Sequence, residues 1–263
     1  MPTLTLAGLD VYYEELGDGP NLLFLNGSGS SIEAAGQLIG RFAEHFHVLV
    51  HDQRGLGRTS VPQRQPTMAD YAADALALLD HVGWATTRVF GISFGGMVAQ
   101  ELAVTAPERV ERLVLACTSA GGRLGASYPL HELAGVPAAE REAISLRIVD
   151  TRFDAEWLAS HPLDRAIVAN RAAGAARERT PEQRRGEALQ IEARRHHDVS
   201  DRLHLVTAPT LVACGEFDGI APPANSVAIH EAITGSQLRT YCGGHLFVFQ
   251  DRQALPDIVE FLT

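Results

Sequence analysis

Residues 89–96 read VFGISFGG, and the residues that follow them are good helix formers. The β-branched and aromatic residues at the start of this stretch favour a strand. A chain that turns from strand to helix within two or three residues crowds its own backbone, so glycine is needed on both sides of the turn, here at Gly91 and Gly95. Ser93 stands at the apex, and its side chain should project above the edge of a sheet. The context therefore predicts an exposed nucleophilic serine, although Gly-x-Ser-x-Gly alone also occurs in ordinary tight turns.

A nucleophilic serine needs a base that accepts its proton and an acid that orients the base. His245 follows the last expected strand and is preceded by two glycines, and Asp218 follows the strand before it. The carboxyl ends of parallel strands lie at one edge of a sheet, so we expect both residues to meet Ser93 there. The chain order Ser, Asp, His is the one expected for such a sheet. Glu216, which is closer to its strand than Asp218, remains the alternative acid.

The oxyanion that forms in serine catalysis needs hydrogen-bond donors. One should be the backbone amide of Phe94, at the start of the helix after Ser93. The second should come from the loop after the first long apolar run, where we expect the backbone amide of Ser28 to donate. Gly27 lets this loop approach closely, and we expect Asn26 and Gly27 to contact the substrate. A plain glycine-rich turn is the alternative interpretation of the loop.

Strand and helix patterns alternate over the first half of the chain. Residues 3–15 form two alternating strands around a turn, which predicts an antiparallel hairpin at a sheet edge. From Leu22 to Cys117, short apolar runs typical of buried strands alternate with amphipathic helices. The strand pattern resumes at residues 209–214 and 237–241. The sequence therefore predicts an α/β fold, a mostly parallel sheet with helices on both faces.

The character of the sequence changes at Ala120. Residues 121–205 contain no strand-like run and carry 13 arginines and 13 acidic residues, so the net charge of −10 belongs to the remainder. We interpret this segment as a helical cap inserted into a core made of residues 1–120 and 206–263. Because a lid must open for product to leave, we expect its contacts with the core to be modest. The predicted cap helices are residues 138–149, 155–158, 163–177 and 181–195.

Phe153 and Trp157 lie at helical spacing within the predicted cap. A substrate pocket should lie between the cap and the sheet, and we expect these two aromatic side chains to line it. Packing within the cap itself is an equally good interpretation of the pair.

The composition excludes several classes of protein. All 22 basic residues are arginine, so chemistry that requires a lysine Schiff base or a phosphate-loop lysine is excluded. The net charge of −10 argues against nucleic acid or an anionic membrane as a partner. The N-terminus lacks a charged start followed by a long apolar run, so the expected location is the cytoplasm.

Cysteine and histidine patterns do not predict a metal site. Cys117 and Cys214 lie in apolar runs and should be buried, and with Cys242 they show no metal-ligand spacing. His196 and His197 are adjacent, but neighbouring histidines on a helix point about 100° apart and rarely share one ion. We therefore expect neither a metal nor a cofactor.

Taken together and in order, these motifs resemble the α/β-hydrolase family over essentially the whole chain. The resemblance rests on residues 52–60 (DQRGLGRTS), 91–96 (GISFGG), 208–218 (APTLVACGEFD) and 243–245 (GGH). The chain is similar in particular to the single-cap branch that contains 3-oxoadipate enol-lactonases, esterases and cofactor-free haloperoxidase-like proteins. Most relatives have His-Gly where this chain has Asn26-Gly27, and enol-lactonase-like relatives also depart there.

The resemblance and the predicted triad imply a serine hydrolase that cleaves a small carboxylic ester or lactone through an acyl-enzyme intermediate. Cleavage of a carbon–carbon bond and haloperoxidase-like chemistry use the same triad and stay open at this point. A non-catalytic small-molecule-binding protein on the same fold is a further hypothesis, which the intact triad disfavours. The expected partner is a small-molecule substrate, and homo-oligomer formation is left open.

Overall fold

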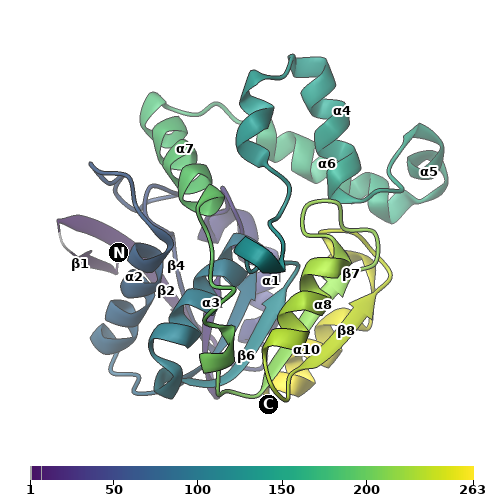
Figure 1. Ribbon diagram of the computed structural model, residues 1–263. Helices are drawn as coiled ribbons and strands as arrows, with labels where there is room; N and C mark the ends of the chain where they lie inside the picture. Colours follow the sequence, from purple (N-terminus) through teal and green to yellow (C-terminus); the bar gives the residue numbers. More distant parts are fainter. Residues whose placement is uncertain (1, 7) are drawn as a thin grey trace.

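The computed structural model describes residues 2–6 and 8–263 (Figure 1). Within them, eight strands form one sheet in the order β1-β2-β4-β3-β5-β6-β7-β8. The β1–β2 and β2–β4 pairs are antiparallel and all other pairs are parallel, which confirms the predicted fold class. The strands are β1 (Thr3–Leu6), β2 (Leu9–Leu16), β3 (Asn21–Leu25), β4 (His47–His51), β5 (Thr87–Ile92), β6 (Val110–Ala116), β7 (Thr210–Gly215) and β8 (Gln237–Tyr241).

Both faces of the sheet are covered by helices, and the side chains of each strand alternate between the two layers. In β3, Leu22 and Phe24 pack into one core cluster, whereas Leu23 and Leu25 pack into the other. Helices α1 (Ile32–Ala43), α9 (Phe247–Gln250) and α10 (Ala254–Leu262) cover the first face. Helices α2 (Met68–His81), α3 (Phe94–Thr105) and α8 (Pro223–Ala232) cover the second. Burial on both faces explains why the central strands are continuous apolar runs.

Between β6 and β7 the chain makes a helical insertion that lies above the carboxyl ends of the strands (Figure 1). Apart from an isolated bridge between Gly121 and Asp198, the described residues of this segment form no strand pairing. None of the helices in the described chain combines the length and hydropathy needed to cross a bilayer. The elements of the insertion are α4 (Ala138–Val149), α5 (Ala155–Ser160), α6 (Pro162–Ala175) and α7 (Pro181–Arg195), with 3₁₀ turns at Gly122–Leu124, Leu130–Gly135 and Leu203–Leu205.

The insertion contacts the core closely at individual positions. At the end of α4, the carbonyl of Val149 accepts a 2.6 Å hydrogen bond from the backbone amide of His245. On α7, Gly186 packs so closely on Gly55 that a Cβ atom at Gly186 would overlap the Gly55 carbonyl oxygen. The insertion is therefore attached to the core at two separate places above the sheet.

Candidate active site

The backbone at Ser93 has the geometry that the flanking glycines predicted. Ser93 lies between β5 and α3 with φ 56° and ψ −117°, a conformation that non-glycine residues rarely adopt. A Cβ atom on Gly95 would overlap the Leu25 carbonyl oxygen, and one on Gly91 would stand 2.5 Å from the carbonyl oxygen of Gly95. Only glycine fits at both flanks, so β3 and α3 hold the strained turn in place from two sides.

Three strand ends bring Ser93, His245 and Asp218 together. Ser93 Oγ lies 2.9 Å from His245 Nε2, and His245 Nδ1 lies 2.8 Å from Asp218 Oδ2. The second carboxylate oxygen of Asp218 accepts hydrogen bonds from the backbone amides of Ile220 (2.8 Å) and Ala221 (2.9 Å). The carboxylate of Asp218 is therefore fixed and directed at the imidazole, which is the arrangement that orients a general base.

Glu216, the alternative acid, is not part of this group. Its side chain is exposed, and its backbone amide donates to the Tyr241 carbonyl across the β7–β8 pair. The backbone amide hydrogen bonds keep Asp218, rather than Glu216, in contact with His245.

The loop after β3 lies against Ser93. A Cβ atom on Gly27 would stand 3.5 Å from the Cβ of Ser93. The buried hydroxyl of Ser28 has no hydrogen-bond partner among the described residues. Phe94 is the first residue of α3, where backbone N–H groups have no partner within the helix. Two backbone segments therefore lie beside the serine, and the donation of Phe94 and Ser28 to an oxyanion stays a prediction.

Asn26 is buried, and its side-chain amide nitrogen makes no hydrogen bond within the described chain. Its backbone carbonyl instead accepts a 3.0 Å bond from Gln53 Nε2. Gln53 Oε1 in turn accepts a 2.8 Å bond from Gln190 Nε2 on α7, and Gln190 Oε1 accepts a 2.8 Å bond from the backbone amide of Gly29. Two buried glutamines therefore fix both ends of the loop that faces Ser93.

The sequence analysis did not identify Gln53 and Gln190. One signal was present: Gly186 interrupts the middle of a predicted helix, and such a glycine often marks a close approach. Gln190 lies four residues further along the same helix face, so it too faces the core.

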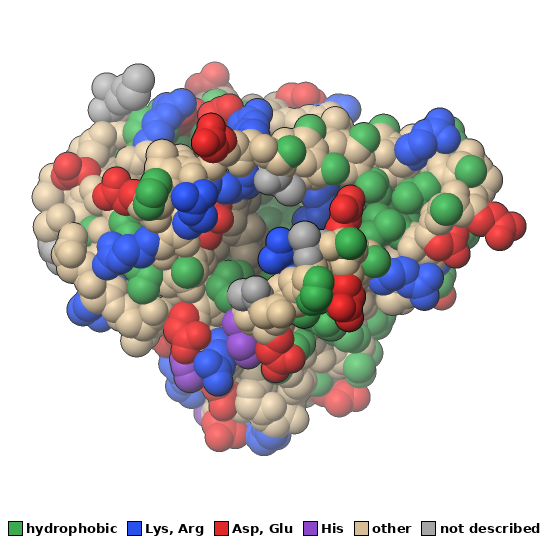
Figure 2. All heavy atoms as spheres, turned by 90° about the horizontal axis from the view of Figure 1, so that it is seen from above, with side chains coloured by type: hydrophobic (Ala, Val, Ile, Leu, Met, Phe, Trp, Pro, Cys, Tyr) green, Lys and Arg blue, Asp and Glu red, His purple; other side chains and the backbone are tan. Residues whose placement is uncertain are grey.

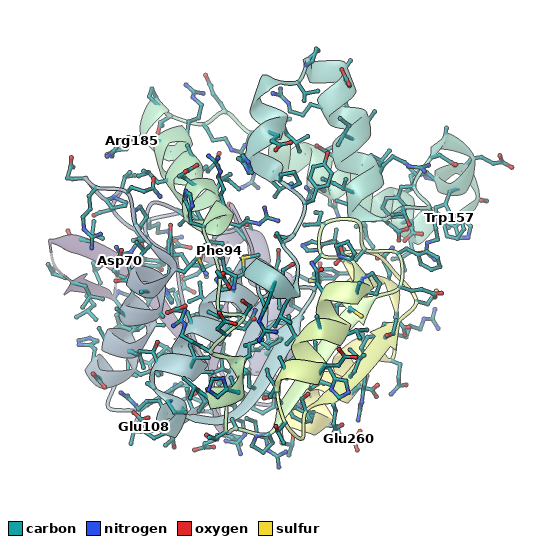
Figure 3. All side chains as sticks on the ribbon, viewed as in Figure 1. Asp70, Phe94, Glu108, Trp157, Arg185 and Glu260 are labelled. Carbon is teal, nitrogen blue, oxygen red and sulfur yellow. The ribbon has the colours of Figure 1, made fainter. Side chains whose placement is uncertain are left out.

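Phe153 and Trp157 lie in different surroundings. Phe153 is fully buried in a small cluster between the insertion and the core, with Leu133, Ile148 and Val149 from the insertion and Ile220 from the loop after β7. Trp157 stacks on His161 and lines a cavity of about 330 Å³ whose lining includes none of the three triad residues. Figure 3 shows Trp157 at the outer edge of the insertion and Phe94 in the middle of the molecule. A role of these aromatic residues in substrate binding stays a prediction.

One group of three ligating side chains lies within 4.8 Å in the described residues: Cys117, Asp218 and His245. Burial and the nearby Asp218 carboxylate raise the pKa of the Cys117 thiol well above its usual value. Cysteine binds a metal ion as the thiolate, so a raised thiol pKa disfavours binding. The Nδ1 atom of His245 is already occupied by Asp218. The donor set therefore suits an acid–base pair beside a buried thiol rather than a metal ion.

The family model of the alpha/beta hydrolase fold matches residues 20–251. The chain belongs to this family. A curated relative, 3-oxoadipate enol-lactonase 2 from Acinetobacter baylyi, is 28% identical over 98% of this chain and 94% of its own length. Poly(3-hydroxyalkanoate) depolymerase from Ectopseudomonas oleovorans is 27% identical over 92% of this chain and 83% of its own length.

Solved structures give the same result for the fold. A hydrolase from Pseudomonas aeruginosa matches with a TM-score of 0.80 and 29% identity, over 99% of this chain and 97% of the other. The enol-lactonase from Burkholderia xenovorans matches with a TM-score of 0.81 over 99% of both chains, at 22% identity. At that identity the second similarity supports the fold alone.

Proposed function

We propose that this protein is a serine hydrolase that cleaves a small carboxylic ester or lactone through an acyl-enzyme intermediate. The observation that carries the proposal is the continuous series of contacts from Ser93 Oγ to His245 and from His245 to Asp218, at 2.9 and 2.8 Å. A relative named as a lactonase and another named as a depolymerase support an ester or lactone bond as the bond that is cleaved.

In the proposed reaction, Ser93 Oγ attacks the carbonyl carbon while His245 Nε2 takes the hydroxyl proton. The backbone amides of Phe94 and Ser28 donate to the oxyanion, and the carboxylate of Asp218 stabilises the imidazolium. Collapse of the tetrahedral intermediate breaks the bond to the alkoxide oxygen, which receives the proton from His245. Water then attacks the acyl-enzyme, with His245 again as base, and the carboxylic acid leaves.

A panel of short methyl esters and five- and six-membered lactones tests this proposal. Acid release measured in a pH-stat should show turnover of at least one member, and Ser93→Ala should abolish it. A β-diketone included in the panel tests cleavage of a carbon–carbon bond. Tight ligand binding without turnover of any compound would instead indicate a binding protein.

We also propose a cytoplasmic location. The three cysteines are free, and Cys242 is exposed. An exposed free thiol is typical of a reducing compartment.

A further inference from the structure

Arg194 lies on the inner face of α7, one turn after Gln190, and only 6% of its surface is exposed. Its Nη1 atom donates a 2.9 Å hydrogen bond to the backbone carbonyl of Tyr128. Its Nε and Nη2 atoms have no partner among the described residues, and no described carboxylate lies within 4.0 Å. Buried charges are normally paired, so half of this guanidinium is available for a ligand.

The two unpaired nitrogen atoms lie on one edge of the guanidinium, and this edge binds carboxylates side-on. The protein itself uses that edge twice. Nε and Nη2 of Arg54 donate to the two oxygens of Asp74 at 2.7 and 2.6 Å. The same atoms of Arg152 donate to the two oxygens of Asp150 at 2.9 and 2.6 Å. Arg194 presents the same two donors without the carboxylate.

Arg194 lines a cavity of about 100 Å³, large enough for a carboxylate group. The lining residues include the hydroxyl-bearing Ser119 and Ser127 and the basic residues His131 and Arg195, and none of them is acidic. In a chain with a net charge of −10, a cavity without any carboxylate and with an unpaired guanidinium is a suitable site for an anion. Figure 2, which views the insertion face, shows a hollow with arginine side chains beside it.

One residue of the cavity lining lies close to Ser93 along the chain. Met97 is four residues after Ser93, about 6 Å along the axis of α3. On α7, Gln190 binds Gly29 in the loop that faces Ser93, and Arg194 is one turn further along the same helix. The lining includes no triad residue, so a group bound here would be a part of the substrate other than the reacting carbonyl.

Burial lowers the pKa of Arg194 to about 10, so this side chain stays charged near neutral pH. Burial also lowers the pKa of His197, another lining residue, to about 4, so its imidazole is neutral there. Both ring nitrogens of His197 lack a partner within the described chain. The cavity therefore offers one fixed positive charge together with an unpaired neutral imidazole.

We propose that this cavity binds a carboxylate at the far end of the substrate while the ester or lactone carbonyl lies at Ser93. Arg194 would hold the two carboxylate oxygens through Nε and Nη2. This inference rests on the proposed hydrolase function and narrows its substrate class to acids that carry a second, esterified carboxyl group.

Matched ester pairs test the inference. The monomethyl esters of succinate, glutarate and adipate are compared with methyl butanoate, pentanoate and hexanoate, in which a methyl group replaces the free carboxylate. The wild-type protein should prefer one acid monoester over its neutral partner in kcat/KM. Arg194→Gln should reduce that preference by ~30-fold or more, as expected when one partner of a buried charge pair is removed, and should leave turnover of the neutral ester within a few-fold.

Two further variants keep the test decisive. Arg184→Gln is the matched control, because Arg184 is an exposed arginine on the same helix and does not line the cavity. This substitution should leave the preference intact. Arg194→Lys keeps the charge but loses the paired donors, so it should retain only part of the preference. If Arg194→Gln does not fold, the preference for the acid monoester is compared between the wild type and Arg194→Lys instead.

The outcomes separate this inference from the proposed function. Equal kcat/KM within every pair, or a preference that survives Arg194→Gln, would overturn the carboxylate site while leaving the hydrolase intact. Added acetate is a further probe of the cavity. If acetate changed the turnover of neutral esters while no acid monoester was preferred, the cavity would be a separate anion site, and the proposed substrate carboxylate site would also be overturned. If a fluorophosphonate labels Ser93 but no methyl ester is cleaved, competition against labelling replaces turnover, and acid monoesters should protect better than neutral ones. Absence of both labelling and turnover would refute the proposed function itself.

Discussion

The two sides of the candidate active site are held by different kinds of contact. On the acid–base side, backbone amides fix Asp218, and the backbone of His245 bonds to Val149 at the end of α4. On the oxyanion side, the loop is held by the side chains of Gln53 and Gln190. Backbone hydrogen bonds at strand ends, at tight turns and at the end of α4 hold the first side, whereas glutamine side chains hold the second. The insertion therefore contributes to both sides, through a backbone carbonyl on α4 and through the side chain of Gln190 on α7.

The largest expected effect comes from the acid–base side. Asp218→Asn removes the charge that orients and stabilises the imidazole, and kcat should fall by ~10⁴-fold with the fold retained. Steady-state kinetics on the best ester, with circular dichroism for folding, measures it. Glu216→Gln is the matched control and should be nearly silent. If kcat fell strongly in Glu216→Gln and only slightly in Asp218→Asn, Glu216 rather than Asp218 would be the acid that orients His245.

A smaller effect is expected on the oxyanion side. Gln190→Leu breaks the bonds to Gln53 and Gly29 but leaves the amide donors in place. We expect kcat to fall by ~10-fold to ~100-fold, less than for outright loss of a donor, with little change in KM. Arg184→Ala, an exposed change on the same helix, is the control. An unchanged kcat in Gln190→Leu would mean that the loop keeps its position without α7.

The same difference explains what the sequence could predict. Gly91, Gly95 and the order Ser93, Asp218, His245 are local signals, because a strained turn and a strand end each restrict the residue types nearby. The fold class followed from strand periodicity and was confirmed. The glutamine contacts join residues as far apart as Gln190 and Gly29, and no local pattern encodes such a pairing.

The pocket lining was the least accessible to sequence analysis. Helical spacing shows that residues share a face, but it does not show what that face meets. Phe153 packs between the insertion and the core, and Trp157 lies at the outer edge of the insertion. An arginine in an arginine-rich helix is normally exposed, so the sequence pattern does not distinguish Arg194 from its neighbours.

Displacing α7 offers a third way to test the comparison. Gly186→Ala would place a methyl group against the Gly55 carbonyl and push the helix outward. We expect a loss of about 1–3 kcal/mol in unfolding free energy from overpacking, and a several-fold drop in kcat. Gly36→Ala, at an exposed position of α1 with open space around it, should instead stabilise by about 0.4–1 kcal/mol. Urea unfolding measures both, and equal effects of the two substitutions would contradict close packing at Gly186.

A pH dependence of stability compares the core with the insertion. Burial lowers the pKa of His51, at the end of β4, and of His197, just after α7, to about 4. The unfolded chain, with an imidazole pKa of about 6.5, binds more protons than the folded one between these values. Stability should therefore fall as pH falls from about 6.5 to about 4. His51→Gln and His197→Gln should each flatten this slope in urea titrations, and an unchanged slope in either would contradict the burial of that imidazole.

The central claim is that Ser93 is a nucleophile activated by His245 and Asp218. Intact-mass spectrometry of the protein after treatment with a fluorophosphonate tests it most directly, because the reagent reports nucleophilicity without any knowledge of the substrate. We predict one adduct per chain, located on Ser93 by peptide mapping, slowed strongly in Asp218→Asn and absent in Ser93→Ala. Labelling that persists in Ser93→Ala, or its absence from the folded wild-type protein, would contradict the claim.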